Sequence, residues 1–238
     1  MHHSIRKGSF MVIGALINAV AIIVGSGAGL AVRGRLSDKF SEGVMRALGL
    51  CVIIIGLYNG LGGDMMLLVT SLAVGTLAGE VIRIDDHLNN FGKWIQEKLK
   101  KPGEHSTFAK GFVTASLLFC VGAMAIVGSI DSGLRDDQSI IITKSIIDGI
   151  ASVFLASTLG VGVLFSAFVV LIYQGAIELF AAGLQDVLTY GMITQISAVG
   201  GVMILGLGVN MALDGKIKVA NLLPSFVVAV LYYSFIIA

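Results

Sequence analysis

The chain has 238 residues, of which 56% are hydrophobic and only 13% are charged. The charged share is about half that of a typical soluble domain, so the composition excludes an ordinary water-soluble protein and indicates that lipid surrounds most of the chain. The formal net charge of +1 gives no reason to expect a nucleic acid or another highly charged partner.

The first ten residues, MHHSIRKGSF, precede a second methionine and resemble an expression leader, so residues 1–10 are left out of the fold prediction. A helix needs about 20 apolar residues to cross the hydrocarbon layer of a bilayer. The runs of about this length or longer are Met11–Val32, Ala47–Gly63, Met65–Val81, Gly111–Ile130, Ser139–Ala182, Val187–Leu213 and Val219–Ala238.

The run from Ser139 to Ala182 must contain a turn. As one helix its 44 residues would be about 66 Å long, which is twice the thickness of the hydrocarbon layer. The glycine-paired stretch Thr158–Gly162 lies near its middle, and we expect the chain to turn there. The sequence therefore predicts an all-α membrane protein with about eight transmembrane helices.

Lysine and arginine gather in the loops that follow the first, third and seventh spans. A count of eight spans places these loops on one side of the membrane, and the positive-inside rule makes that side cytoplasmic. Both termini are then predicted to lie outside. The residues concerned are Arg33, Arg35, Lys39 and Arg46 in the first loop, Arg83, Lys93, Lys98, Lys100, Lys101 and Lys110 in the second, and Lys216 and Lys218 in the third.

The one long polar stretch runs from Asp85 to His105 and contains several lysines and the single tryptophan, Trp94. Its apolar residues recur at helical spacing, which predicts an amphipathic helix on the cytoplasmic membrane surface, ended by Pro102 and Gly103. The apolar face of this helix would consist of Leu88, Phe91, Ile95 and Leu99.

Two parts of the chain resemble each other when the stretch from Val12 is set against the stretch from Val161. The basic loop of the first part falls opposite a loop without Lys or Arg in the second, and the reverse holds one loop later, as expected if the second part is inverted. The coincident residues include Gly14 with Gly162, Leu16 with Leu164, Asn18 with Ser166, and Gly27 with Gly175.

The predicted organisation is therefore 3+2+3 helices with an inverted-topology repeat. Its parts are a first three-helix repeat (residues 11–84), a cytoplasmic amphipathic segment (85–109), two central helices (110–159) and an inverted three-helix repeat (160–238). Inverted repeats are characteristic of secondary transporters, whose sites lie where the two copies meet, and they also occur in channels.

The fifth span contains two opposite charges, Lys144 and Asp148, which lie one helical turn apart on one face, and Ser152 continues this stripe. In one interpretation the pair lies near the outer interface and Lys144 snorkels to the headgroups. In the other, the pair is buried and lines a polar cavity. There Asp148 would bind a cation or a proton, and Lys144 would hold an anion or act as a built-in countercharge.

Other polar residues within the spans are candidates to line the same path. They are Asn18, Asn59, Gln174 and Asn210. The alternative for each is a structural hydrogen bond between helices. Glu80 and Glu178 lie near span ends and are expected at the membrane interface.

The two cysteines, Cys51 and Cys120, both lie in apolar runs and are expected to fill the core as free thiols. No zinc-type spacing and no catalytic Ser-His-Asp, HExxH or CxxC pattern is present. We therefore expect neither an enzyme nor a cofactor, and the sequence leaves the question of a metal ion open.

Six motifs in order, MVIGALINA, GTLAGE, LLFCVGAMAIVGSIDSG, ITKSIIDG, ISAVGG and VANLLPS, together resemble the YqgA/YdfK-like bacterial membrane proteins, a family of unknown function. The resemblance covers nearly all of residues 11–238. It implies a multi-pass protein of the bacterial cytoplasmic membrane, and it supplies neither a substrate nor any site residues.

The leading functional hypothesis is a transporter of a small ion or polar solute, with its site at the repeat interface. An ion channel is one alternative. Another is a non-transporting scaffold or sensor that binds a partner through Asp85–His105. The expected partners are the lipid bilayer and the transported solute, and glycine-rich helix faces make a homodimer a further possibility.

Overall fold

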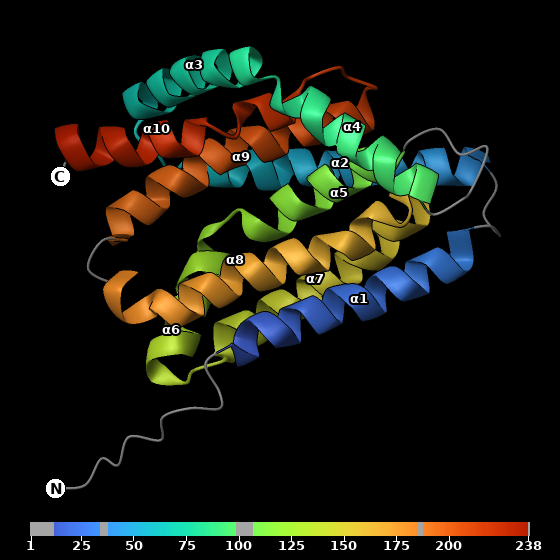
Figure 1. Ribbon diagram of the computed structural model, residues 1–238, viewed down its shortest axis with the longest axis horizontal. Helices are drawn as coiled ribbons and strands as arrows, with labels where there is room; N and C mark the ends of the chain where they lie inside the picture. The colour runs from blue at the N-terminus through green and yellow to red at the C-terminus, as the bar shows by residue number, and fades with distance from the viewer. Residues whose placement is uncertain (1–11, 34–37, 99–106, 185–187, 238) are drawn as a thin grey trace, which may run out of the picture.

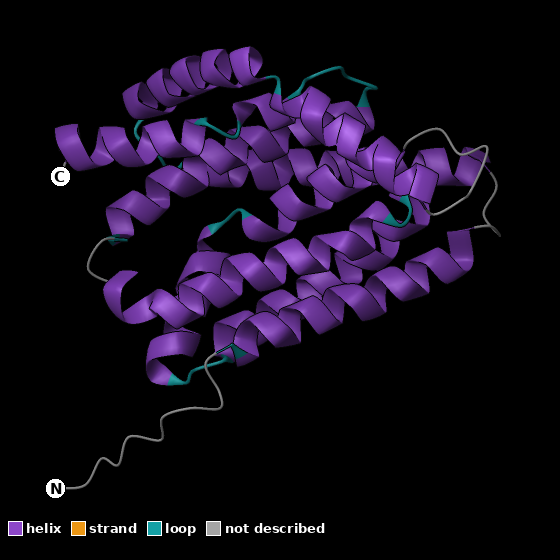
Figure 2. Ribbon diagram, viewed as in Figure 1, coloured by secondary structure: helices purple, strands orange, loops and turns teal. Residues whose placement is uncertain are grey.

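The computed structural model describes residues 12–33, 38–98, 107–184 and 188–237, and these residues form helices and short connections without any strand (Figures 1 and 2). The proposed leader and the predicted stop at Pro102–Gly103 lie outside the described residues. The helices are α1 (Ile13–Arg33), α2 (Asp38–Gly60), α3 (Met65–Ile82), α4 (Ile84–Lys98), α5 (Thr107–Cys120), α6 (Ala123–Arg135), α7 (Ser139–Leu159), α8 (Gly162–Leu184), α9 (Tyr190–Ala212), the 3₁₀ turn η1 (Val219–Leu222), α10 (Ser225–Tyr232) and the π turn η2 (Tyr233–Ile237).

Among the described residues, seven helical segments are long and apolar enough to cross a membrane, or up to eight if the bent pair α5 and α6 forms one span. The all-α class is confirmed, and the predicted count of eight is the upper of these two numbers. The turn predicted at Thr158–Gly162 is also confirmed, since α7 ends at Leu159 and α8 begins at Gly162. Gly160 between them has a φ of +81°, a conformation that glycine adopts without steric cost.

The predicted span Gly111–Ile130 is not one continuous helix. The chain breaks between α5 and α6, whose axes differ in direction by 60°. Gly122 lies at this break with a φ of +125°, which an L-residue rarely adopts. The sequence prediction failed here because hydropathy records only that the residues are apolar, whereas the break depends on the backbone of one glycine.

The helices pack in pairs that are distant in sequence (Figure 1). In one layer α1 packs along α7 and α8, and α8 also packs along α5 and α6. In the other layer α2 packs along α9, and α3 packs along η1 and α10. The first layer positions the candidate site.

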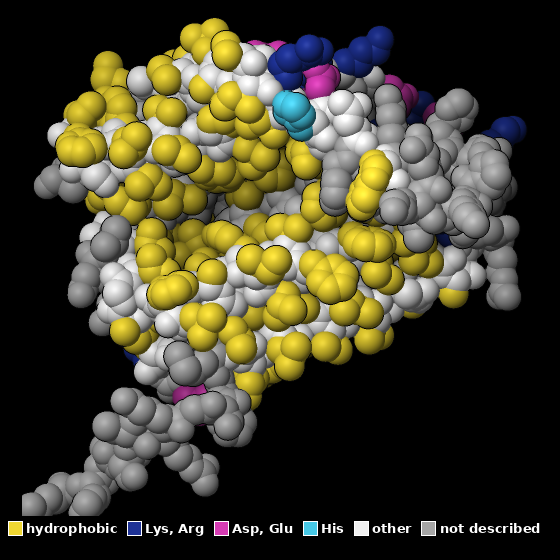
Figure 3. Space-filling view, viewed as in Figure 1, with side chains coloured by type: hydrophobic (Ala, Val, Ile, Leu, Met, Phe, Trp, Pro, Cys, Tyr) yellow, Lys and Arg dark blue, Asp and Glu magenta, His cyan; other side chains and the backbone are white. Residues whose placement is uncertain are grey.

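The outer surface of the bundle carries large apolar side chains, as lipid contact requires. Ile54, Leu77, Val81 and Ile172 are all at least 67% exposed. Figure 3 shows apolar side chains over most of the visible face and Lys and Arg side chains gathered toward one end. Both cysteines are free thiols. Cys120 is half-buried, whereas Cys51 is exposed on this surface, so the expectation that Cys51 fills the core was wrong.

The polar stretch is helical over Ile84–Lys98 as α4, and this helix packs on α5 and η1. Its amphipathic placement on the membrane surface stays a prediction. Arg83, which joins α3 to α4, adopts the left-handed conformation with a φ of 59° and its N–H caps α3 at the carbonyl of Gly79. The turn between the two helices is therefore a single residue, and α4 leaves α3 without a flexible connection.

Candidate functional site

Lys144 and Asp148 lie deep within the first layer. Asp148 follows the first residue of α7 by nine positions in a helix of 21 residues, so it lies about 14 Å along a helix of about 31 Å. Lys144 is 6% exposed and Asp148 is 5% exposed. The ammonium group of Lys144 therefore does not snorkel to a surface, and the structure agrees with the burial of the pair. That the pair lines a polar cavity stays a prediction.

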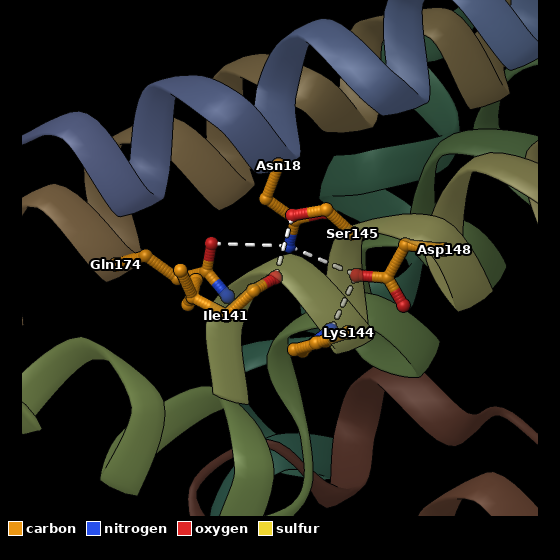
Figure 4. A network of polar contacts seen from close by, with 6 residues as sticks. All are labelled: Asn18, Ile141, Lys144, Ser145, Asp148 and Gln174. Carbon is orange, nitrogen blue, oxygen red and sulfur yellow. Dashed lines mark hydrogen bonds and ion pairs between the residues drawn. The ribbon is translucent and has the colours of Figure 1, made fainter. Parts of the chain in front are cut away.

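Four side chains from three helices form one polar network (Figure 4). On α7, Lys144 Nζ forms an ion pair with Asp148 Oδ2. From α1, Asn18 Nδ2 donates to the same carboxylate oxygen at 3.0 Å and to Gln174 Oε1 of α8 at 3.1 Å. The structure thus brings together four of the predicted site residues, all buried.

Two polar atoms of this network have no hydrogen-bond partner among the described residues. They are Asn18 Oδ1, an acceptor, and Gln174 Nε2, a donor, and both are buried. A buried polar atom without a partner costs about 1–3 kcal/mol, and most such atoms in folded proteins are satisfied. The network therefore has one acceptor and one donor free to bind a small polar species.

Ser152 lies one turn beyond Asp148, where α7 crosses α1. Its hydroxyl donates to Gly149 O at 2.8 Å and lies 3.3 Å from Ile22 O of α1. Gly25 of α1 faces this hydroxyl at a distance that leaves no room for a side chain. Ser152 therefore continues the polar stripe of α7 at a point of close helix contact.

Glu178 was expected at the membrane interface. It lies near the end of α8 and beside the first turn of α1, and its side chain is buried inside the bundle with only 2% exposed. It lies one turn after Gln174 on α8, and its Oε1 accepts a hydrogen bond of 2.7 Å from Ala15 N in the first turn of α1. The first four N–H groups of a helix lack partners within the helix. Glu178 supplies a partner for one of them, and it extends the polar line from Gln174 toward the start of α1.

The structure does not bring Asn59 and Asn210 to this network. Asn59 Nδ2 donates to Ile55 O of its own helix at 2.9 Å. Asn210 forms two hydrogen bonds with the backbone of Ile217, at 2.7 and 3.0 Å, and so fixes the connection that follows α9. Both residues lie near helix ends, where unpaired backbone groups compete for a side-chain amide.

Within the described parts of the chain, no three His, Cys, Asp or Glu side chains lie close enough together to hold a metal ion. The chemistry of the site therefore depends on one ion pair, two amides and the neighbouring carboxyl of Glu178. This set can exchange protons or small ions and can form hydrogen bonds with a polar solute.

Sequence comparison connects the chain with bacterial membrane proteins. It is 33% identical over 221 residues to the uncharacterized membrane protein YdfK of Bacillus subtilis (strain 168), which covers 90% of this chain and 93% of YdfK. It is 29% identical over 224 residues to the uncharacterized protein YqgA of Escherichia coli (strain K12), with 92% and 95% covered. No solved structure matched the chain.

The family model described as "Protein of unknown function (DUF554)" matches residues 13–234, which is nearly the whole of the described chain. Together with the apolar helices, this match agrees with a multi-pass α-helical membrane protein. The chain belongs to the DUF554 family.

Proposed function

We propose that the chain moves a small ion or polar solute across the bacterial cytoplasmic membrane along the seam between α1, α7 and α8. The observation that carries the proposal is the buried Lys144–Asp148 pair, which is bound to Asn18 and through it to Gln174. The proposal includes the predicted orientation, with both termini outside and the lysine-rich end of the bundle in the cytoplasm.

The cost of burying charge supports a functional role for this pair. Insertion scales place an isolated charge at the centre of a membrane helix at about 2.5–3.5 kcal/mol. Pairing reduces that cost, yet a buried ion pair is often no more stable than apolar residues of the same volume. Two leucines would therefore give α7 an equal or greater stability, so the presence of the charges supports a role beyond stability.

In this proposal Asp148 binds the cation or proton, and Lys144 is the built-in countercharge. A cation that arrives at Asp148 competes with the Lys144 ammonium for the same carboxylate. The free acceptor Asn18 Oδ1 can then coordinate this cation, and the free donor Gln174 Nε2 can hold a water molecule or an anion that accompanies it. Glu178 lies toward the predicted outer end and Ser152 lies toward the inner end, so the polar line extends on both sides of the pair.

An inverted repeat would place this site where transporter sites are found. The main helix contacts map onto one another when α1 is exchanged with α8, α2 with α9, α3 with α10, and α7 with the α5–α6 pair. The helices α1 and α8 run antiparallel, because Asn18 meets Gln174 whereas Ala15 meets Glu178. The Asn18–Gln174 hydrogen bond would then join the two repeats, as in transporters with inverted topology.

The repeat alignment gives these polar positions partners in the other copy. Asn18 aligns with Ser166, and the same offset aligns Ser26 with Gln174. Ser26 and Ser166 are both completely buried. The seam between α1 and α8 would therefore have polar residues at two related levels, and the broken helix α5–α6 would correspond to α7, which carries the ion pair.

The test is charge movement by the purified protein in liposomes on a solid-supported membrane, under imposed gradients of H⁺, Na⁺ and K⁺. We expect the wild type to produce a current with at least one of these ions, and Asp148→Asn to abolish it. Asn59→Ala is the matched control, since it removes an intramembrane amide outside the network. A current from Asp148→Asn equal to that of the wild type would remove this carboxylate from the mechanism.

The same recordings separate a carrier from a channel. A carrier current saturates as the ion concentration rises, whereas a channel current continues to rise over a wider range. If none of the three ions moves and the wild type is fully folded, the non-transporting scaffold or sensor becomes the better explanation. That alternative would place function in α4, and deletion of residues 85–105 would then remove it.

A further inference from the structure

Two adjoining cavities are lined by residues outside the polar network, and α5 and α9 contribute to both of them. The first, called here the lysine pocket, has a volume of about 270 Å³ and lies between α4, α5, the end of α9 and η1. The charged side chains that line it are Lys110, Lys216, Lys218 and Asp85. It lies at the predicted cytoplasmic end of the bundle, where lipid headgroups would be.

The second cavity, called here the apolar groove, has a volume of about 540 Å³. It is lined by α5, α6, α8, α9 and α10 and by Leu88 of α4, and Figure 3 shows a hollow with apolar walls between α8 and the layer of α9 and α10. Of the described side chains that line it, only those of Ser116 and Tyr173 carry an oxygen atom. Its size lies within the range of about 300–1,000 Å³ that is typical of ligand sites.

The two cavities share part of their lining. Leu88 of α4 and Val113 of α5 border both of them. From this shared border the groove follows α5 as far as its break at Gly122. The lysine pocket and the apolar groove are therefore neighbours that meet at Leu88 and Val113.

Charge in the lysine pocket is unbalanced in favour of an anion. Three lysines face one aspartate, and among the described residues none of the three forms an ion pair. Burial raises the pKa of Asp85 above its ordinary value, and the nearby Lys218 ammonium opposes that rise. An excess of two positive charges is therefore available to an anionic ligand.

Hydrogen bonds hold the walls of this pocket in place. Asn210 fixes the segment that carries Lys216 and Lys218 through its two bonds to Ile217. Asn221 Oδ1 of η1 accepts a bond of 2.7 Å from Asp85 N at the start of α4. The pocket is thus formed by two segments that are each fastened to the helix bundle, and only the lysine side chains need to move when a ligand binds.

From these observations we propose that the chain binds an anionic phospholipid of the inner leaflet. The phosphate lies in the lysine pocket and one acyl chain lies in the apolar groove. Basic pockets between membrane helices on the cytoplasmic side are suited to anionic headgroups. The groove offers an acyl chain apolar walls and covers few polar atoms when the chain binds. A soluble anion would use the pocket but would leave the groove unoccupied.

The test is native mass spectrometry of the full chain titrated with phosphatidylglycerol, and separately with zwitterionic phosphatidylethanolamine. We expect preferential binding of phosphatidylglycerol. Each lysine near an anionic surface contributes about fivefold to binding, so Lys216→Gln/Lys218→Gln should weaken phosphatidylglycerol binding roughly 25-fold. The matched control is Lys39→Gln/Arg46→Gln, which removes the same charge from residues outside the pocket and should leave binding unchanged.

A second pair of variants tests the groove without altering charge. Ser116→Phe fills the groove from α5 and removes no hydrogen bond, since Ser116 Oγ has no partner among the described residues. We expect it to weaken binding of both lipids, whereas Ser116→Ala should bind as the wild type does. If Ser116→Phe does not fold, Val230→Trp fills the same groove from α10.

Three outcomes would overturn the proposal. One is equal binding of the two lipids, and another is unchanged phosphatidylglycerol binding in Lys216→Gln/Lys218→Gln. The third is displacement of the lipid by inorganic phosphate together with normal binding in the folded groove variants, which would show that the pocket takes a soluble anion.

Discussion

Two long helix contacts in this protein use small residues in different ways. Along the α2–α9 contact, glycines let two backbones meet: a Cβ on Gly56 would lie only 2.5 Å from Leu205 N, and one on Gly49 only 2.6 Å from Ala212 N. The two asparagines of these helices, Asn59 and Asn210, form their bonds with backbone at the helix ends. The α2–α9 contact is therefore a packed contact without a polar interior.

The α1–α7 contact also has glycines at the points of closest approach, Gly25 and Gly29. Unlike the α2–α9 contact, it encloses an ion pair and two amides, shared with α8. Close packing alone does not require these polar groups, because α2 and α9 achieve it without them. The polar groups of the α1–α7–α8 seam are thus the ones that call for a functional explanation.

The largest effect is expected from removing one partner of the ion pair. Asp148→Leu leaves the Lys144 ammonium buried without its counterion, and loss of one partner of a buried pair costs roughly 3–5 kcal/mol. Lys144→Met/Asp148→Leu should recover most of that loss, because no unpaired charge is left. Both the loss and its recovery are measured as free energies of unfolding, by titrating the protein in mixed micelles with SDS. A double variant as unstable as the single one would contradict this interpretation of the pair.

The next effect concerns the packed contact. Gly56→Leu places a side chain against the backbone of α9, and overpacking of this kind costs about 1–3 kcal/mol. Gly27→Leu is its matched control, since no atom lies within 4 Å of a Cβ at Gly27. We expect only Gly56→Leu to lower the free energy of unfolding in the same titration. Equal stability of the two variants would show that α2 and α9 do not pack this closely.

A smaller effect is expected at the outer end of the polar line. Glu178→Ala leaves Ala15 N without its acceptor, which should cost about 1–2 kcal/mol. Glu178→Gln retains an acceptor oxygen at the same place and should lose less. Amide hydrogen exchange at the start of α1 reports this directly, with faster exchange expected in Glu178→Ala. Unchanged exchange there would mean that Glu178 does not cap α1.

The smallest effect is expected at Asn59, which bonds only with the backbone of its own helix. Asn59→Ala should change the free energy of unfolding by less than about 0.5 kcal/mol. Asn18→Ala should cost clearly more, because it leaves Asp148 and Gln174 without a shared donor. If the two alanine variants were equally stable, the distinction between amides inside and outside the network would fail.

Much of the fold could be predicted from hydropathy and charge. The turn after Leu159 follows from helix length, and the all-α class follows from composition. The pairing of Lys144 with Asp148 follows from their spacing of four residues on one helix. These features depend only on residues that are close together in the sequence, so they could be predicted without knowing the helix neighbours.

The rest depends on which helices become neighbours. Glu178 was expected at the interface because it lies near a span end, but the start of α1 packs over it and buries it. Its spacing of four residues from Gln174 was the signal that could have placed it on the same polar face. Asn59 resembled Asn18 in sequence, and only the tertiary contacts separate a structural amide from one in the network.

Ion movement through the α1–α7–α8 seam is measured most directly with the charge-free variant Lys144→Met/Asp148→Leu, once it has been shown to fold as stably as the wild type. Reconstituted in liposomes under the ion gradient that drives a wild-type current, it should give none, since the seam no longer contains an ionisable pair. A current of wild-type size from this stable variant would show that ions cross the protein without Asp148 or Lys144, and the ion pair would then have no part in transport.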